Sequence, residues 1–195
     1  MKYSNKKVVI SAGHLRESDL CHGTVLLLII RALEDRDFEA LARFISEIYS
    51  EYPDATWFDS APSRDTLSDL FLSKLSSMRN HGLIDTVAIE NDSVEGECEI
   101  VRFPNGTGYV GIIIAKGHRR KGLGSTLLKV SEMLASETGT DTLYAEVSEG
   151  NAPARAFFGR SGFEEVGVAQ RALPKPSRQN VLLFRKKLQK EARRV

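Results

Sequence analysis

The spacing of apolar residues along the chain changes from a helical period to the alternation typical of strands. Residues 25–32 are mostly apolar, a pattern typical of a buried strand. Apolar side chains then recur at helical spacing in residues 34–52 and again in residues 63–82, where Ser63 or Asp65 can serve as the N-cap. The pattern therefore predicts one strand followed by two helices.

A segment with strand-like patterning follows these helices. It predicts three strands, at residues 85–91, 97–103 and 108–115. Between the last two lies Asn105–Gly106, the pair most typical of a two-residue hairpin, because both positions tolerate a positive φ. We therefore expect the second and third of these strands to be antiparallel neighbours.

The second half of the chain alternates between helices and strands. A helix is predicted from Gly122 onwards, then a strand at residues 141–148 and a short helix at residues 151–162. Two strands, at residues 163–168 and 180–188, close the pattern. This order predicts a mixed α/β domain with a mostly antiparallel central sheet of about six to seven strands, flanked by helices.

Composition and charge narrow the class of protein. The chain has 195 residues, of which 42% are hydrophobic and 27% charged, as in ordinary globular proteins. This length fits one domain, which we place at residues 25–188, between an N-terminal extension (1–24) and a basic C-terminal tail (189–195). The formal net charge is only +1, whereas a protein devoted to nucleic acid usually carries a larger basic excess.

The cysteines, histidines and apolar runs indicate in which cellular environment the protein works. Cys21 and Cys98 lie far apart, and the four histidines show no metal-ligand spacing, so we expect reduced thiols and no metal. The longest apolar run, residues 25–30, is too short to span a membrane, and no convincing signal-cleavage site follows the start. We expect a cytoplasmic protein with no membrane partner.

The segment HRRKGLGSTLL, residues 118–128, places basic side chains before a Gly-x-Gly step at a predicted helix start. Free N–H groups and the helix dipole attract anions there, and glycine lets a phosphate approach the backbone. The Walker pattern is missing, and the dinucleotide fingerprint fits poorly because Leu127 stands in place of its third glycine. A basic solvated loop with structural glycines explains the same residues.

Two motifs together resemble the GNAT superfamily of N-acetyltransferases. RRKGLG (119–124) fits the pyrophosphate loop Arg/Gln-x-x-Gly-x-Gly/Ala, and NAPARAFFGRSGF (151–163) resembles the segment Asn-x-x-Ala-x-x-Phe-Tyr-x-x-x-Gly-Phe. With the order of elements, the resemblance covers roughly residues 25–188. It implies acetyl-CoA as the acetyl donor, bound in a V-shaped opening where the fourth and fifth strands (108–115 and 141–148) run parallel and splay apart.

The resemblance also assigns cofactor-binding residues. Backbone amides near Ile114 would polarise the thioester carbonyl, as an oxyanion hole does. The loop from Arg119 to Ser125 would hold the pyrophosphate, and Asn151 would bond near the pantetheine arm or a water, although a plain helix N-cap explains Asn151 equally well. The expected cofactor-binding residues are Ile112, Ile114, Arg119, Arg120, Lys121, Gly122, Gly124, Ser125, Asn151 and Phe158.

The acceptor amine must lose a proton before it attacks. In the branch of the family that acetylates ribosomal-protein N-termini, a glutamate precedes the valine of the fifth strand, and Glu146 matches that place; a partly exposed strand carboxylate is the structural alternative. The tyrosine that the family uses to protonate the leaving thiolate is replaced by Phe158, so another group or water must substitute. The catalytic candidates are Glu146, Tyr144 and Ser148, with Glu97 and Glu99 in reserve.

The resemblance places the acceptor pocket on the first two helices and their connection, residues 46–62. Aromatic and acidic side chains there suit a cationic amine, although aromatics anchored in the core explain the same composition. These side chains are Tyr49, Glu51, Tyr52, Asp54, Trp57, Phe58 and Asp59.

The sequence thus predicts an N-acetyltransferase that moves an acetyl group from acetyl-CoA to a primary amine, on a small molecule or a peptide, by direct attack in a ternary complex. A non-catalytic acyl-CoA-binding regulatory domain is the alternative, because Phe158 replaces the tyrosine and a fourth-strand carboxylate is missing. Nucleic-acid binding through residues 184–195 is disfavoured, since this basic segment has no aromatic residue beyond Phe184. Assembly as a homodimer is left open.

Overall fold

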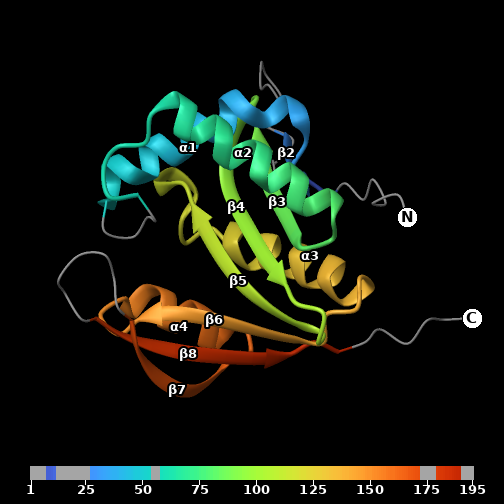
Figure 1. The fold of residues 1–195 in the computed structure, drawn as a ribbon, viewed down its shortest axis with the longest axis vertical. Coiled ribbons are helices and arrows are strands. Elements are labelled where there is room, and N and C mark those ends of the chain that lie inside the picture. Colours follow the sequence, from blue (N-terminus) through green and yellow to red (C-terminus); the bar gives the residue numbers. More distant parts are fainter. Residues whose placement is uncertain (1–7, 12–26, 54–57, 172–178, 190–195) are drawn as a thin grey trace, which may run out of the picture.

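The structure, a computed structural model, describes residues 8–11, 27–53, 58–171 and 179–189. These residues form one eight-stranded sheet in the order β1-β2-β3-β4-β5-β6-β8-β7, with four α-helices (Figure 1). The strands are β1 (Val8–Ser11), β2 (Leu27–Ala32), β3 (Leu83–Glu90), β4 (Ser93–Arg102), β5 (Thr107–Ile114), β6 (Thr142–Ser148), β7 (Glu164–Arg171) and β8 (Gln179–Lys187). The helices are α1 (Phe38–Glu51), α2 (Arg64–Arg79), α3 (Leu123–Glu137) and α4 (Ala152–Arg160).

The predicted mixed α/β fold is confirmed, with every predicted helix and strand in its place. The sheet has one strand more than expected, because Val8–Ser11 pairs antiparallel with Leu27–Ile30 at its edge. Four residues are too few to show a clear alternation of apolar and polar positions. Part of the segment that we expected to be an extension therefore joins the sheet.

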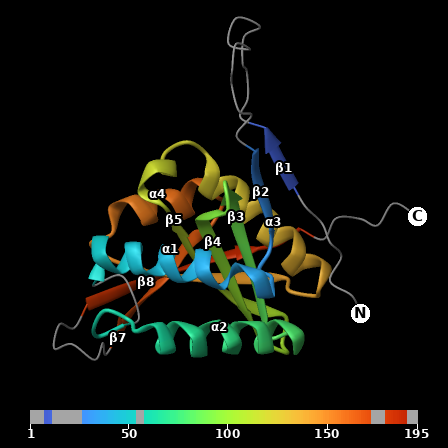
Figure 2. The same cartoon turned by 90° about the horizontal axis from the view of Figure 1, so that it is seen from above.

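Helices cover both faces of the sheet. Figures 1 and 2 show α1 and α2 on one face and α3 and α4 on the other. Two clusters of buried apolar side chains correspond to these layers: one includes Leu41, Phe44 and Phe71 under α1 and α2, and the other includes Leu127 and Leu143 under α3 and α4. No helix within the described residues is long and apolar enough to cross a membrane.

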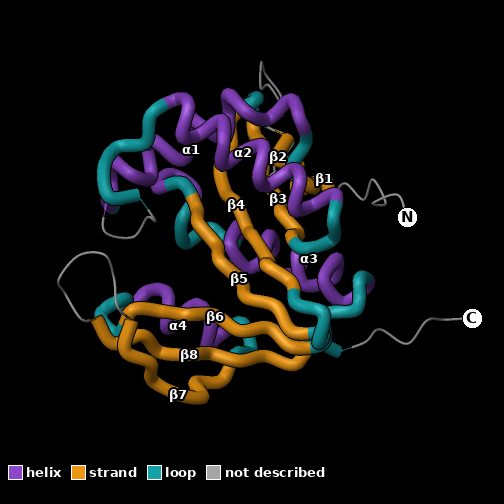
Figure 3. Tube along the Cα trace, in the orientation of Figure 1, coloured by secondary structure: helices purple, strands orange, loops and turns teal. Residues whose placement is uncertain are grey.

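One pair of neighbouring strands runs parallel, and it separates after a short contact. β5 and β6 pair only through Thr107–Tyr109 and Thr142–Tyr144. Beyond these residues β5 stays paired to β4 and β6 to β8, so the two halves of the sheet diverge, as the trace in Figure 3 shows. The expected splay of the fourth and fifth predicted strands is thus present, as β5 and β6.

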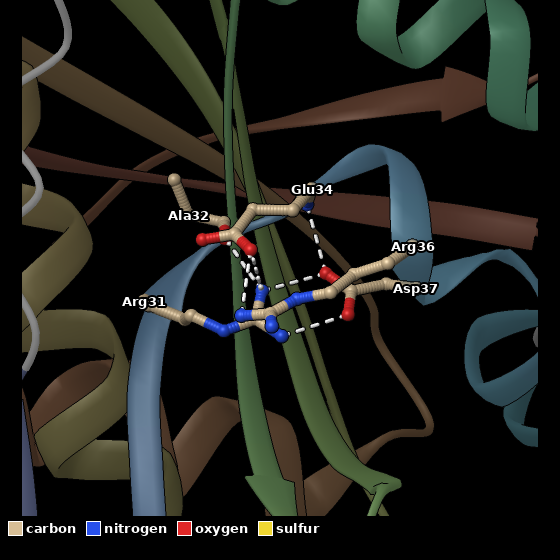
Figure 4. Close-up of polar contacts among 5 residues, drawn as sticks. All are labelled: Arg31, Ala32, Glu34, Arg36 and Asp37. Carbon is tan, nitrogen blue, oxygen red and sulfur yellow. Dashed lines mark hydrogen bonds and ion pairs between the residues drawn. The ribbon is translucent and has the colours of Figure 1, made fainter.

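A buried ion pair fixes the connection from β2 into α1 (Figure 4). The guanidinium of Arg31 donates two hydrogen bonds to the carboxylate of Asp37, at 2.6 and 2.7 Å, and a third to the carbonyl of Ala32 at 3.0 Å. The backbone N–H of Glu34 donates to the same carboxylate at 2.8 Å. The side chains of Arg31 and Asp37 are only 8% and 6% exposed, so each charge depends on the other.

We expect Asp37→Ala to lower the free energy of unfolding by about 3–5 kcal/mol, because the buried guanidinium of Arg31 then keeps only the longer contact with Glu34, at 3.9 Å, as an ion pair. The matched control is Asp35→Ala, since Asp35 pairs with Arg79 where both side chains are at least 70% exposed. That change should cost no more than about 1 kcal/mol. Chemical denaturation measures both, and equal losses would contradict the role given to the buried pair.

Candidate functional site

The opening between β5 and β6 has a vertex made of two tyrosines. Tyr109 and Tyr144 are the last paired residues of the two strands, and their rings stack at 5.5 Å with an interplanar angle of 27°. From Val110 to Ile114 the β6-facing edge of β5 lacks a β6 partner. Because such backbone groups need hydrogen-bond partners, this edge can accept an extended ligand that carries amides.

A tight loop leads from β5 into α3 at the open end. A single 3₁₀ turn, Lys116–His118, follows β5, and Arg120 and Gly122 then adopt left-handed φ values of 62° and 87°. The helix starts at Leu123, and the backbone N–H of Thr126 donates to the carbonyl of Gly122 at 3.2 Å. By helix geometry the N–H groups that precede Thr126 have no acceptor within the helix, so they remain for an anion.

Gly124 is required by packing as well as by access to the backbone. A Cβ at this position would lie 3.3 Å from the ring of Phe157 and 3.5 Å from Ile114. A side chain here would therefore push against α4 and β5, so a bulky substitution would disturb packing as well as access to the backbone. Loss of ligand binding by Gly124→Val would not by itself identify a phosphate contact.

The basic residues of the loop divide into two groups. Arg119 donates two hydrogen bonds to the carboxylate of Glu51, both 2.8 Å long, so it is paired with α1. His118 lies 3.4 Å from Glu95 and 3.5 Å from Glu90 on the β3–β4 hairpin. Arg120 and Lys121 are exposed, and within the described residues neither makes an ion pair. Of the three cations expected at the phosphates, only these two are available in this arrangement.

The remaining cofactor candidates lie on both sides of the opening. Ile112 and Ile114 are half-buried on β5 and pack on the core under α3 and α4, while Ser125 is exposed in the first turn of α3. Asn151 caps α4, because its side-chain oxygen accepts from the N–H of Ala154 at 3.1 Å. The capping interpretation of Asn151 is confirmed, and a contact with the cofactor stays a prediction.

Phe158, which stands where the related tyrosine is expected, is a core residue. It is 5% exposed and packs edge-on against Phe157 and Phe163, with ring centroids 5.2 and 5.1 Å away. Phe184 on β8 completes the aromatic cluster at 6.3 Å. A contact of Phe158 with the cofactor is therefore a prediction that this packing does not demonstrate.

The three catalytic candidates share one face of β6, as the alternation predicts. Leu143, Ala145 and Val147 are buried on the α3 and α4 side. Tyr144, Glu146 and Ser148 consequently face the side of α1 and α2, where Glu146 is exposed and the other two are half-buried. Glu146 lies two residues beyond the vertex on this face, at the border of the opening, but its role as a base stays a prediction.

The region expected to bind the acceptor is described in part. Glu51 and Tyr52, at the end of α1, contact Arg119 of the loop after β5. Phe58 is half-buried and Asp59 exposed, whereas Asp54 and Trp57 lie outside the described residues. The described residues therefore place the end of α1 beside the loop that precedes α3.

A buried charged cluster under α2 was not predicted from the sequence. The ammonium of Lys74 lies 3.0 Å from carboxylate oxygens of both Asp85 and Glu97, and it also contacts Glu99. The side chains of Lys74, Asp85 and Glu97 are 7% exposed or less, whereas that of Glu99 is 32% exposed. Glu97 is therefore poorly placed as a base for a substrate. Among the four residues of this cluster, Glu99 is the most exposed to solvent.

The three carboxylates have oxygens within 4.8 Å of one another, a spacing that can hold a metal ion, but the ammonium of Lys74 already lies among them. Burial raises the pKa of Asp85 well above its ordinary value, and the charge of Glu97 raises it further. The oxygen Oδ1 of Asp85 has no hydrogen-bond partner in the structure. A proton on this carboxyl group would turn an isolated acceptor into a donor toward Glu97.

Both the sequence and the fold of the chain match known proteins. The sequence model of the acetyltransferase (GNAT) family matches residues 42–163, which is more than half of the chain. The chain therefore belongs to the GNAT family of acetyltransferases. No curated protein sequence matches the chain.

Solved structures with the same fold include acetyltransferases. A ribosomal-protein-alanine N-acetyltransferase from Brucella melitensis is 24% identical, with a TM-score of 0.69 over 82% of this chain and 99% of its own. RimL, a ribosomal L7/L12 alpha-N-protein acetyltransferase in complex with coenzyme A, is 13% identical, with a TM-score of 0.75 over 84% of this chain and 96% of its own. The protein yncA from Salmonella typhimurium, solved with acetyl-CoA, is 19% identical, with a TM-score of 0.69 over 85% and 96%.

The buried cluster makes a prediction about pH. Because burial raises the pKa of Asp85 in the folded protein above the ordinary aspartate value of about 3.9, this group lowers stability as pH rises from about 4 toward its folded pKa. Asp85→Asn imitates the protonated form. We expect its free energy of unfolding near pH 4 to lie within about 1 kcal/mol of wild type, with a smaller decline as pH rises above 4.

The contrasting variant is Lys74→Met, which leaves buried carboxylates without their cation and should cost about 3–5 kcal/mol. Denaturation at a series of pH values measures both variants. A loss for Asp85→Asn as large as that for Lys74→Met would show that Asp85 is ionised in the folded protein.

Proposed function

We propose that this protein is an N-acetyltransferase that moves an acetyl group from acetyl-CoA to a primary amine of a small molecule or a peptide. The observation that carries the proposal is the opening after Tyr109 and Tyr144, with the glycine-containing start of α3 at its open end. An unpaired strand edge suits the amides of pantetheine, and a helix N-terminus suits a pyrophosphate. Both lie on the path that one extended acetyl-CoA molecule would follow.

In this arrangement the chain binds acetyl-CoA through three kinds of group. The edge of β5 around Ile112 and Ile114 pairs with the pantetheine arm, and a backbone N–H there polarises the thioester carbonyl. The N–H groups at Gly122, Gly124 and Ser125 receive the pyrophosphate. The exposed Arg120 and Lys121 add positive charge beside it.

The acceptor amine approaches from the face of α1 and α2. Deprotonating a lysine-like amine, with a pKa of about 10.4, costs roughly 4–5 kcal/mol at pH 7, whereas an α-amine near pKa 8 costs about 1 kcal/mol. Glu146 lies on that face at the border of the opening and takes the proton, directly or through a water. The neutral nitrogen then attacks the thioester carbon, and the C–S bond breaks.

The leaving thiolate receives its proton from Tyr144, Ser148 or water, because Phe158 has no proton to give. A thiol with a pKa of about 8.5 is a fair leaving group, so the missing tyrosine reduces the rate without preventing the reaction. Direct attack in a ternary complex therefore needs no covalent intermediate on the protein.

The first experiment combines binding and turnover. Acetyl-CoA should raise the melting temperature by mass action, and release of free thiol should depend on the amine when the protein is offered a panel of polyamines, aminoalcohols, lysine peptides and peptides with free N-termini. Binding of acetyl-CoA without transfer to any amine would favour the non-catalytic acyl-CoA-binding alternative. Failure to bind acetyl-CoA would refute the proposal.

Ser125→Glu tests the phosphate site with opposite effects on folding and binding. A carboxylate in the first turn of a helix stabilises it by about 0.3–1 kcal/mol, while the same charge repels a pyrophosphate. We expect an unchanged or higher melting temperature and an acetyl-CoA Kd at least about tenfold weaker, measured by calorimetry. Lys129→Gln, an exposed position of α3 with the same change in net charge, should leave the Kd nearly unchanged. Equal Kd values for both variants would remove the pyrophosphate from this helix end.

Glu146→Gln tests the proton acceptor. General bases contribute about 10²–10⁴-fold, so kcat should fall within that range while the acetyl-CoA Kd stays the same. The residual rate should climb with pH, because free amine then forms without help. Glu165→Gln, an exposed carboxylate on β7, is the control and should keep the wild-type rate. A wild-type rate and pH profile in Glu146→Gln would assign the proton to another group, with Glu99 as the partly exposed alternative.

A further inference from the structure

Arg119 is bound on three sides by groups of the protein itself. Its Nη1 and Nη2 donate to the two oxygens of Glu51 at 2.8 Å each, and its Nε donates to the carbonyl of Ile114 at 2.8 Å. Nη1 also lies 3.1 Å from the hydroxyl of Tyr52, and the guanidinium carbon lies 5.0 Å from the centre of the Tyr52 ring. Arginine is suited to this arrangement, since its planar fork matches a carboxylate.

These contacts join two parts of the chain that have different functions in the proposed reaction. Ile114 is the last residue of β5, on the edge assigned to the cofactor. Glu51 is the last residue of α1, and Tyr52 is the C-cap at the start of the wall assigned to the acceptor. The guanidinium of Arg119 therefore bridges the strand assigned to the cofactor and the helix assigned to the acceptor. Its two partners, Glu51 and Ile114, are 63 residues apart in the sequence.

The pair is an ion pair over the pH range in which the enzyme would work. Hydrogen bonding to Arg119 lowers the pKa of Glu51, and the neighbouring Lys116 contributes in the same direction. Hydrogen bonding to Glu51 raises the pKa of Arg119. The side chains are 22% and 29% exposed, so water reaches the pair only in part. A pyrophosphate would have to compete with this carboxylate for the same donors.

We propose that Glu51 and Arg119 are positioning residues that couple acetyl-CoA binding to acceptor binding, rather than ligands of the pyrophosphate. This inference rests on the proposed function. Arg119 holds the carbonyl of Ile114 in the orientation that presents the β5 edge to pantetheine, and Glu51 holds Arg119. An acetyl-CoA that fits this edge also favours the position of the α1 end, and an acceptor bound at the α1 end favours the same edge. Such coupling is reciprocal: each ligand changes the affinity of the other by one factor.

The decisive variant is Glu51→Gln, because the two roles of Arg119 predict opposite signs. If Arg119 were a pyrophosphate ligand held back by Glu51, removing the charge of Glu51 would release it and tighten acetyl-CoA binding. If the pair positions the β5 edge, the same change weakens acetyl-CoA binding, although Glu51 touches no phosphate. We expect a Kd about three- to tenfold weaker, together with a higher KM for the acceptor.

A matched control is present on the same helix. Glu39 of α1 forms a similar fork with Arg64 of α2, where the side chains are 57% and 67% exposed and no contact with β5 is made. Glu39→Gln removes the same charge from the same helix. It should leave both the acetyl-CoA Kd and the acceptor KM at their wild-type values.

Arg119→Lys separates positioning from simple charge. Lysine keeps the positive charge that a phosphate requires but cannot form the fork to Glu51 and the bond to Ile114 together. We expect the variant to lose kcat/KM by the same factor with acetyl-CoA and with acetyl-pantetheine, which has no pyrophosphate. Thermal melting of each variant confirms that the protein is folded under the assay conditions.

The outcomes distinguish a failure of the coupling from a failure of the proposed function. Tighter or unchanged acetyl-CoA binding in Glu51→Gln overturns the positioning role, as does a loss in Arg119→Lys that is confined to acetyl-CoA. An equal effect of Glu39→Gln would make the effect one of helix charge and would also overturn it. If the wild-type protein does not bind acetyl-CoA, the proposed function fails before the coupling is tested.

Discussion

The site depends on one interruption in the backbone hydrogen bonding of the sheet. β5 and β6 share three residue pairs, yet each is held along its other edge by seven pairs, β5 by β4 and β6 by β8. Two firmly held strands therefore diverge from a fixed vertex. Unpaired edges inside a sheet are costly unless something satisfies them, so the opening is suited to a ligand that has its own amides.

Much of this arrangement follows from local sequence, because the decisive turns depend on a few residues. The strands predicted on either side of Asn105–Gly106 pair antiparallel, but four residues join them instead of two, and of this pair Gly106 alone has a positive φ, 81°. Gly122 has a φ of 87° at the predicted start of α3, and Asn151 caps α4 as its residue type suggests. Alternation on β6 also predicted which face carries Glu146. A short strand carries too little pattern to be predicted from its own residues. The four residues of β1 form a strand because they pair with β2.

What the sequence could not provide are contacts between distant charged residues. Arg119 belongs to a basic run that suggests a phosphate, but its partner Glu51 lies 68 residues earlier. Glu97 and Glu99 flank Cys98 in a strand pattern that normally turns carboxylates toward water, yet α2 covers that face and supplies Lys74. The available signal was the presence of three acids, Asp85, Glu97 and Glu99, on two neighbouring predicted strands, since three carboxylates on one covered face require a cation.

The carboxyl group of Asp85 couples the folding of this protein to the uptake of a proton. Because its pKa in the folded protein lies well above the ordinary value, a chain that folds between these two pKa values takes up a proton from the solvent. Unfolding returns that proton to the buffer. The heat measured for unfolding therefore contains the protonation enthalpy of the buffer, and it differs between buffers with small and large ionisation enthalpies at the same pH. One fully buried carboxyl group thus makes the unfolding of this protein a proton-releasing reaction between these two pKa values.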